Sequence, residues 1–289
     1  MDRTLIIAVI SIAFGMSLIP LGDTFGKAML GLGVAPLFVA FARYFLGSLL
    51  LIPFTGIRNV LPLIKNWRVW FRAGLQVGAV LSILTSLQTE SLANAFGAFF
   101  AGPMVSYLLS AWLLGEKITW ARTVLLIIGF CGVLLVVKPG FAMTTGLAFA
   151  ALGGFFYGAF LTTSRWLSTL GRSQDLMLSQ VIIGAVFLAP VGMLNLPNFT
   201  FNLSLLLIGS GAASMLGNLL IVLAYARAPA SILAPFVYVQ LVSAMMLGFV
   251  IFGDWPDPIS LMGLTLIFFS GAATLAFSRP KRATKHPTP

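Results

Sequence analysis

The feature that most constrains this chain is the recurrence of long apolar stretches from one end to the other. A helix needs about 20 mostly apolar residues to cross the ~30 Å hydrocarbon core of a bilayer. Stretches of this kind occur at residues 4–29, 34–54, 70–90, 93–114, 120–138, 145–167, 175–194, 203–225, 229–251 and 258–278. They are continuous rather than alternating, which favours helices over the strands of a barrel. We therefore predict an all-α integral membrane protein with ten transmembrane helices.

The composition excludes a water-soluble fold and disfavours an enzyme. Charged residues make up 8% of the 289 residues, against about 25% in a typical soluble domain. One cysteine and one histidine, His286 near the C-terminus, offer no ligand set for a metal and no histidine-based catalysis within the helices. The sequence has no P-loop for ATP. We expect no catalytic residues, no metal and no cofactor.

The basic residues are distributed unevenly between the predicted loops. With the N-terminus in the cytoplasm, Lys27 and Lys138 fall on the far side and Arg43 within a span. The remaining basic residues fall on the cytoplasmic side: Arg3, Arg58, Lys65, Arg68, Arg72, Lys117, Arg122, Arg165, Arg172, Arg227, Arg279, Lys281, Arg282 and Lys285. Such a bias orients membrane proteins. It predicts cytoplasmic N- and C-termini in a bacterial inner membrane, and it accounts for the net charge of +10 without a nucleic-acid partner.

The chain divides near Gly140 into two halves, residues 1–140 and 141–278, followed by a basic tail at 279–289. Each half holds five predicted helices, and an odd number places the second half upside down relative to the first. Gly115-Glu116-Lys117 precedes the last helix of the first half, and Gly253-Asp254 precedes the last helix of the second. We therefore predict two inverted five-helix repeats, an architecture found in many secondary transporters.

Motifs spread over residues 4–278 resemble the drug/metabolite transporter superfamily, in its ten-helix EamA group. They are Phe14-Gly15 (the family often has Trp-Gly), Asp23-x-x-x-Lys27, Arg43-Tyr44-Phe45, Ala101-Gly102-Pro103 with Gly115-Glu116-Lys117, and Tyr238–Val242 with Phe252–Asp257. The resemblance implies a secondary transporter of a small organic metabolite that works by alternating access, most often an exporter. Uptake of a vitamin or cofactor-like solute, such as riboflavin or S-adenosylmethionine, is the alternative, and a homodimer is left open.

Two other classes of function compete with a transporter. A membrane-embedded enzyme would be expected to carry histidines or paired acids, and the chain has seven acids in all. A passive channel or a scaffold is the other class, but neither a filter loop nor a ring of like charges is visible. Both are therefore disfavoured.

Charged residues within the predicted helices are the first candidates for a site, because charges are costly in a membrane. Asp23 and Lys27 are four residues apart on one helix face and are able to pair. Arg43 would approach Asp23 if the first two helices form an antiparallel hairpin. The group either contacts solute and gates the pathway or is a structural ion pair. Asp23 is the best candidate for a protonatable coupling residue.

Polar and aromatic residues on several other helices complete the predicted substrate site. Ser82, Thr85 and Ser86 form a stripe that either lines a cavity or bonds to a neighbouring helix. Aromatic residues give either a wall for solute or ordinary packing, and Pro103 is able to kink its helix for gating. In an inverted repeat, corresponding helices of the two halves should line the central cavity, and the family resemblance implies which helices these are. This argument favours Asn218, Tyr238 and Gln240 as solute contacts. The other predicted contacts are Phe96, Phe100, Tyr157, Asn218, Tyr238 and Gln240.

Overall fold

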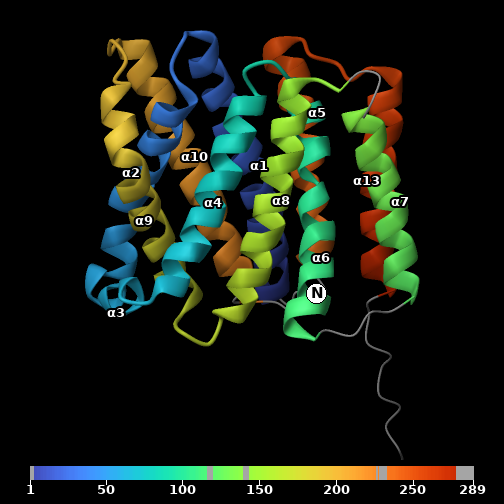
Figure 1. Ribbon diagram of the computed structural model, residues 1–289, viewed down its shortest axis with the longest axis horizontal. Coiled ribbons are helices and arrows are strands. Elements are labelled where there is room, and N and C mark those ends of the chain that lie inside the picture. The colour runs from blue at the N-terminus through green and yellow to red at the C-terminus, as the bar shows by residue number, and fades with distance from the viewer. Residues whose placement is uncertain (1–2, 116–119, 139–142, 226, 228–232, 278–289) are drawn as a thin grey trace, which may run out of the picture.

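The computed structural model describes residues 3–115, 120–138, 143–225, 227 and 233–277. Within these ranges the chain forms helices and no strand, as predicted. The long helices lie side by side and run along a common direction (Figure 1).

The helices of the first half follow the predicted apolar stretches. They are α1 (Arg3–Gly31), α2 (Pro36–Thr55), η1 (Ile57–Asn59), α3 (Leu61–Ile64), α4 (Trp67–Ser86), α5 (Leu92–Phe99), α6 (Ala101–Leu114) and α7 (Trp120–Val137). The short elements η1 and α3 lie in the connection between α2 and α4, where the apolar pattern is interrupted.

The second half has a comparable order of helices. They are α8 (Thr145–Trp166), α9 (Ser173–Leu194), α10 (Phe201–Tyr225), the 3-10 helix η2 (Ala234–Tyr238), α12 (Val239–Leu247), the π-helix η3 (Gly248–Phe252) and α13 (Pro258–Phe277). The described part of the stretch at 229–251 is therefore a succession of three helix types rather than one uniform α-helix.

Seven helices in the described residues are long and apolar enough to cross a membrane. They correspond to α1, α2, α4, the α5–α6 pair, α8, α9 and α10. The other three predicted spans coincide with shorter apolar helices at Thr123–Val137, Phe236–Phe252 and Pro258–Gly271. The protein is thus a multi-pass membrane protein by the length and composition of its helices.

The helix predicted over 93–114 is divided at Phe100 into α5 and α6. Pro103 lies in the first turn of α6. A proline lacks the N–H that would otherwise bond to the carbonyl four residues earlier, so it is tolerated at a helix start. Pro103 therefore stands just after a helix break, and not at a bend within a continuous helix.

The glycines of the two repeated motifs adopt the same backbone conformation. Gly115 follows α6 with a φ of 67°, and Gly253 follows η3 with a φ of 71°. This left-handed region costs glycine little, and such a residue commonly ends a helix. Glu116 and Lys117, which complete the first motif, lie outside the described residues.

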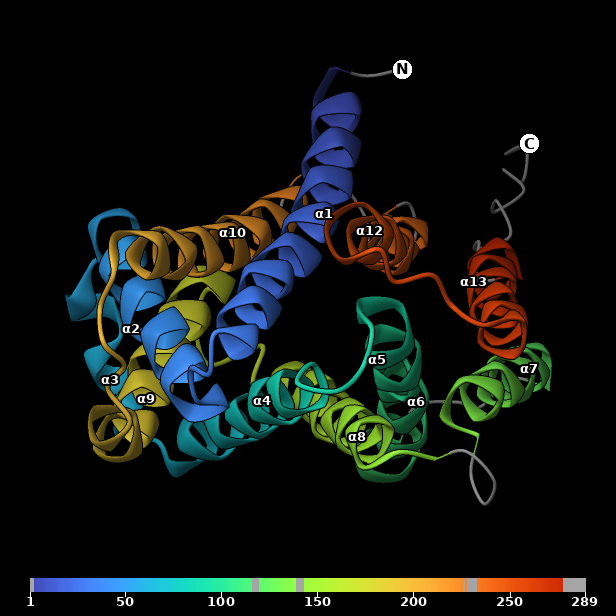
Figure 2. The same ribbon diagram turned by 90° about the horizontal axis from the view of Figure 1, so that it is seen from above.

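Neighbouring helices pack in pairs that join the two halves of the chain. The closest pairs are α1 with α10, α4 with α8, α2 with α9, α7 with α13, and α6 with α8. In Figure 2, α7 and α13 lie together at one end of the molecule, and α2, α9 and α10 lie at the other. Helices α1, α4, α5, α8 and α12 lie between these groups (Figure 2).

Glycines at the crossings bring the backbones of paired helices together. A Cβ atom on Gly217 of α10 would lie 2.8 Å from the carbonyl oxygen of Gly15 of α1. A Cβ atom on Gly132 of α7 would lie 2.6 Å from the carbonyl oxygen of Gly263 of α13. In a membrane, where apolar burial adds little between helices, such close packing is a main source of association.

Candidate functional site

A buried ion pair joins the first two long helices. The Asp23 carboxylate lies 2.6 Å from the Arg43 guanidinium, and the two side chains are 7% and 8% exposed. Arg43 also donates a hydrogen bond of 2.8 Å to the hydroxyl of Ser214 on α10. The approach of Arg43 to Asp23 is therefore confirmed, and the pair ties α1 and α2 to a helix of the second half.

Lys27 does not pair with Asp23 as the spacing suggests. Its ammonium group donates to the carboxylate of Asp254 at 2.7 Å and to the backbone carbonyl of Glu90 at 2.9 Å. It also lies 4.9 Å from the centre of the Phe252 ring. Lys27 thus connects α1 to the link between α4 and α5 and to the residue that follows Gly253, while Asp23 is paired with Arg43.

Other charged residues gather at the same end of the bundle. The Glu90 carboxylate accepts a hydrogen bond from Thr144, which precedes α8. Lys138, which follows α7, lies 2.7 Å from Asp257, which precedes α13. Hydrogen bonds from Lys138 and Ser260 hold the pKa of the Asp257 carboxyl well below its ordinary value. We call Lys27, Glu90, Lys138, Asp254 and Asp257 the end cluster.

The predicted polar stripe of α4 faces α8. Ser82 is 6% exposed and Ser86 is fully buried. A Cβ atom on Gly153 of α8 would lie 3.1 Å from the Cβ atom of Ser82, so the two helices meet at this face. Thr85 donates its hydroxyl to Leu81 within its own helix. The stripe is therefore part of the α4–α8 contact in this conformation.

The predicted aromatic residues fall into separate contacts. Phe96 is 1% exposed and belongs to the main apolar core. The rings of Phe100 and Tyr238 lie 5.7 Å apart, which joins the start of α6 to η2 of the second half. Tyr157 of α8 lies 5.1 Å from Phe99. The structure brings Phe100 and Tyr238 together and leaves Phe96 enclosed by core side chains.

The two predicted amides lie on different helices. Asn218 is exposed and donates to the carbonyl of Ser214, one turn earlier on α10. The hydroxyl of Ser214 is the group that bonds to Arg43, so Asn218 adjoins the buried ion pair along the helix. Gln240 is half-buried near the start of α12. On the same helix, Ser243 donates to Ser17 of α1 at 3.0 Å, a contact that the sequence does not single out.

Arg72 is a further buried charge that the sequence assigns to a loop. It lies in α4 and is 7% exposed. Its guanidinium donates to the hydroxyl of Ser164 at 2.8 Å and to the carbonyl of Leu176 at 3.1 Å, which joins α4 to α8 and α9. Its position within the stretch 70–90 is the sequence signal that distinguishes it from the true loop residues.

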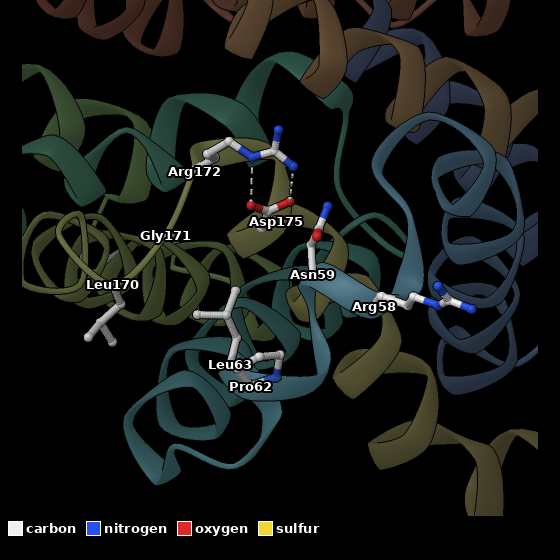
Figure 3. Close-up of a pocket in the computed structure, with 8 residues that line it drawn as sticks. All are labelled: Arg58, Asn59, Pro62, Leu63, Leu170, Gly171, Arg172 and Asp175. Carbon is white, nitrogen blue, oxygen red and sulfur yellow. Dashed lines mark hydrogen bonds and ion pairs between the residues drawn. The ribbon is translucent and has the colours of Figure 1, made fainter.

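A shallow groove of about 490 Å³ (Figure 3) lies beside α3, at the end of the bundle opposite to the one where α4 ends and α8 begins (Figure 1). It lies between the η1–α3 segment and the start of α9, and its lining residues are Arg58, Asn59, Pro62, Leu63, Leu170, Gly171, Arg172 and Asp175. Arg172 and Asp175 are joined by two hydrogen bonds of 2.9 and 3.0 Å. These bonds raise the pKa of the Arg172 guanidinium.

The described residues contain no group of three or more His, Cys, Asp or Glu side chains that would hold a metal ion. The described candidate site therefore consists of one buried ion pair, hydroxyls, amides and aromatic rings. Such groups suit the binding of an organic solute by hydrogen bonds, charge and stacking.

Comparisons with known proteins match this chain over most of its length. The model of the EamA-like transporter family matches residues 4–138 and again residues 144–276. A protein named S-adenosylmethionine uptake transporter, from Rickettsia prowazekii, is 26% identical over 261 residues, which cover 86% of this chain and 85% of that protein. A riboflavin transporter of Vibrio cholerae is 25% identical and covers 85% of this chain and 84% of its own length.

Two further comparisons bear on direction and on fold. The pseudopaline exporter CntI of Pseudomonas aeruginosa is 27% identical over 198 residues, which cover 66% of this chain and 67% of that protein. A solved crystal structure has a TM-score of 0.65 at 20% identity and covers 92% of this chain and 96% of its own. At that identity the crystal structure shows a shared fold alone.

Proposed function

The chain belongs to the EamA-like transporter family and is a membrane transporter of small molecules rather than an enzyme; on this premise, we propose that it is a secondary transporter that moves a small organic metabolite by alternating access. We propose export of an amino acid or related metabolite as the direction. The chain would lie in a bacterial inner membrane with both termini in the cytoplasm, in agreement with the bias of its basic residues.

The pairing of the helices carries this proposal. Suppose that the helices of the first half correspond in chain order to those of the second: α1 to α8, α2 to α9, α4 to α10, α5–α6 to α12, and α7 to α13. The contact of α1 with α10 then corresponds to that of α8 with α4, and the contact of α6 with α8 to that of α12 with α1. The contacts of α2 with α9 and of α7 with α13 correspond to themselves. A twofold axis in the membrane plane would produce this exchange, which supports ten helices in two inverted repeats over 1–140 and 141–278.

The proposed solute site combines the buried ion pair with residues at contacts between the halves. We propose that the solute contacts Asp23, Arg43, Ser82, Thr85, Ser86, Phe96, Phe100, Tyr157, Asn218, Tyr238 and Gln240. Support comes from the Arg43–Ser214 bond and the Phe100–Tyr238 contact, which both join the first half to the second. Movement of one repeat against the other would open these contacts and expose their polar groups.

Coupling and gating are assigned to three residues. Asp23 would couple transport to protons, because protonation of its carboxyl would remove the charge that neutralises Arg43. Lys27 would gate the pathway, since its bond to Asp254 joins α1 to the segment before α13 at one end of the bundle. Pro103 would allow α6 to move relative to α5, because it lies just after the break at Phe100.

Uptake is the second candidate direction. It is favoured by the name of one relative that covers more than four fifths of this chain, an S-adenosylmethionine uptake transporter, while a riboflavin transporter of similar coverage favours a cofactor-like solute. On this alternative, the same site would take a vitamin or cofactor-like solute into the cell.

Reconstitution into proteoliposomes tests the transport function and identifies its solute. The purified protein is assayed for uptake and counterflow of aromatic amino acids, riboflavin and S-adenosylmethionine, with protein-free vesicles as the blank. We expect saturable flux of at least one solute. Absence of flux for every small organic solute tested would overturn the proposal.

An Asp23→Asn variant tests the coupling role in the same vesicles. We expect loss of the pH dependence of transport. The matched control is Asp257→Asn, which makes the same chemical change in the end cluster. A rate and pH profile that Asp23→Asn leaves unchanged would show that Asp23 does not couple transport to protons.

A further inference from the structure

We propose that the groove of Figure 3 binds the phosphodiester headgroup of an anionic phospholipid of the surrounding bilayer, such as phosphatidylglycerol. Its walls are the η1–α3 segment on one side and the link from α8 to α9 with the start of α9 on the other. Arg58 and Arg172 would contact the phosphate oxygens. None of the proposed solute contacts lines this groove, and the inference does not require that the protein transport a solute.

The groove lies at the depth of the lipid headgroups. Its walls are segments that connect spanning helices, since η1 and α3 lie between α2 and α4, and Leu170–Arg172 lies between α8 and α9. Trp67 at the start of α4 and Trp166 at the end of α8 are 66% and 43% exposed. Tryptophan gathers at the boundary between hydrocarbon and water in membrane proteins. The two rings therefore mark this end of the bundle as the headgroup level.

The groove also lies at the outer edge of the molecule. In Figure 2, α3 and α9 lie together at one end, away from α1, α8 and α12 in the middle and from α7 and α13 at the other end. The outer edge of a multi-pass protein is the part that meets the surrounding lipid. A phospholipid would therefore reach the groove by diffusion within the bilayer, without entering the bundle.

Packing holds the two walls of the groove together. Leu63 of α3 is buried and belongs to one apolar cluster with Val69 of α4 and Leu176 of α9. A Cβ atom on Gly171 would lie 3.5 Å from the Leu63 side chain, so the link between α8 and α9 lies against α3. These contacts shape the groove before any ligand binds.

Exposed apolar side chains beside the groove suit the acyl chains of a lipid. Ile57 of η1 and Leu61 of α3 are exposed on one wall, and Leu170 is exposed on the other. Arg58 and Lys65, also exposed, lie in the same short stretch of chain as Ile57 and Leu61. This mixture of exposed apolar and basic residues is typical of segments that lie in the plane of a membrane surface.

The charged residues of the groove leave it with a net positive charge. Two arginines, Arg58 and Arg172, stand against one carboxylate, that of Asp175. Arg172 donates to both oxygens of this carboxylate, at 2.9 and 3.0 Å, and the Asp175 side chain is only 9% exposed. In Figure 3, the remaining terminal nitrogen of Arg172 lies on the side of the guanidinium away from Asp175. An anion would therefore meet this outward side of Arg172 rather than the carboxylate.

The chemistry of these groups favours an anionic lipid over other anions. A guanidinium presents paired N–H donors that match two oxygens of a phosphate group, and charge-assisted bonds of this kind are strong. A phosphatidylcholine carries the same phosphate beside a positive choline, so its attraction to a basic groove is weaker. Inorganic phosphate has no acyl chains to pack on Ile57, Leu61 and Leu170. The groove therefore fits a ligand with both a net negative charge and acyl chains.

Ligand-dependent stability measures this binding. The full-length protein is purified in dodecylmaltoside micelles, and its unfolding temperature is followed as dioctanoyl phosphatidylglycerol is added at constant ionic strength. A ligand that binds the folded state raises that temperature with concentration. We expect a saturable rise, and little effect from dioctanoyl phosphatidylcholine or from inorganic phosphate. No rise, or an equal rise with phosphatidylcholine, would overturn the proposal, and an equal rise with inorganic phosphate would overturn the assignment to a lipid.

Two substitutions that remove the same charge separate the groove from the general charge of this end. Arg58→Gln should weaken phosphatidylglycerol binding about fivefold, the effect of one basic residue close to an anionic lipid. Arg3→Gln is the matched control and should leave binding unchanged. Arg3 is exposed at the start of α1, which lies at the same end of the bundle as α3 in Figure 1 but apart from it in Figure 2. Equal effects of the two substitutions, or no effect of Arg58→Gln, would overturn the proposal.

Asp175→Asn should change the affinity in the opposite direction. It removes the negative charge of the groove, keeps the shape of the side chain and releases Arg172 from its ion pair. We expect phosphatidylglycerol to bind about fivefold more tightly, by the same electrostatic effect. Unchanged or weaker binding in the folded variant would overturn the role of Arg172. If Asp175→Asn does not fold, the comparison of Arg58→Gln with Arg3→Gln, both at exposed residues, decides the question.

Discussion

The ammonium nitrogen of Lys27 lies 2.7 Å from a carboxylate oxygen of Asp254, although the two residues are 227 positions apart in the chain. Lys27 lies near the end of α1, and Asp254 lies between η3 and α13. The same nitrogen donates to the carbonyl of Glu90. One side chain therefore holds three segments together at one end of the bundle, and a motion that opens this end must break its bonds.

Removing the Lys27 ammonium should weaken this end of the protein. Lys27→Met keeps an unbranched apolar side chain of nearly the same length and loses two hydrogen bonds, and we expect a loss of about 1–2 kcal/mol in the free energy of unfolding. Denaturant unfolding in detergent micelles measures it. Lys65→Met, at an exposed residue, is the matched control and should change stability little. If Lys27→Met and Asp254→Asn have additive effects in the double variant, the two residues are not energetically coupled.

Removing one partner of the buried Asp23–Arg43 pair should destabilise the protein more than removing both. Asp23→Leu leaves the Arg43 guanidinium buried without its anion, and we expect a loss of about 3–5 kcal/mol. The double variant Asp23→Leu with Arg43→Met removes both charges and should be more stable than Asp23→Leu alone. The unfolding free energies of the single and double variants give the coupling. A double variant less stable than Asp23→Leu would contradict the pairing.

The contact of α8 with the α5–α6 segment should be sensitive to a single methyl group. A Cβ atom on Gly154 of α8 would lie 2.6 Å from the carbonyl oxygen of Phe99, so Gly154→Ala forces the segments apart. We expect it to destabilise the protein by about 1–3 kcal/mol. Gly74→Ala on α4 is the control, because its Cβ atom would meet Phe187 at an ordinary 3.5 Å. Equal unfolding temperatures for the two variants would show that the contact adapts to the methyl group without loss of stability.

The end cluster should make stability depend on acid pH through Asp257. Its folded-state pKa lies below the ordinary 3.8, because Lys138 and Ser260 donate hydrogen bonds to the carboxylate. A depressed carboxyl pKa stabilises the fold at pH values above the unfolded pKa. That stabilisation is lost as the pH falls from about 4 toward the folded-state pKa. Asp257→Asn should therefore be less stable than the wild type at neutral pH, and the difference should shrink on acidification. Unfolding free energies of the two proteins measured across that pH range check this prediction. A difference that does not change with pH would exclude the linkage to Asp257.

The apolar runs were sufficient to locate the helices, because a bilayer imposes a minimum length of apolar residues on any spanning helix. They did not reveal the break at Phe100 or the change of helix type through η2, α12 and η3. The break lies beside Pro103, whose effect is local, whereas the segment from η2 onward includes Tyr238, whose ring meets Phe100 of the other half. Hydropathy averages over a window and carries no information on such contacts.

The sequence also singled out Asp23, Lys27 and Arg43 as charges that a membrane tolerates for a reason. It did not distinguish their partners, since spacing along one helix favours Asp23 with Lys27, whereas the fold pairs each with a residue from another segment. Arg72 illustrates the same limit. Its place near the start of an apolar stretch groups it with loop charges, whereas its burial follows from the approach of α8 and α9.

By itself, the sequence determined the all-helical membrane fold, the position of its helices and the family, because apolar length and short motifs are properties of local sequence. The tertiary structure decided which charges are neutralised and which are left without an anion. Lys27 is bound to Asp254, Arg43 to Asp23, and Arg72 to uncharged groups. The physical reason is that an ion pair or a hydrogen bond requires atoms within about 3 Å, and only helix packing brings residues from distant parts of the chain that close.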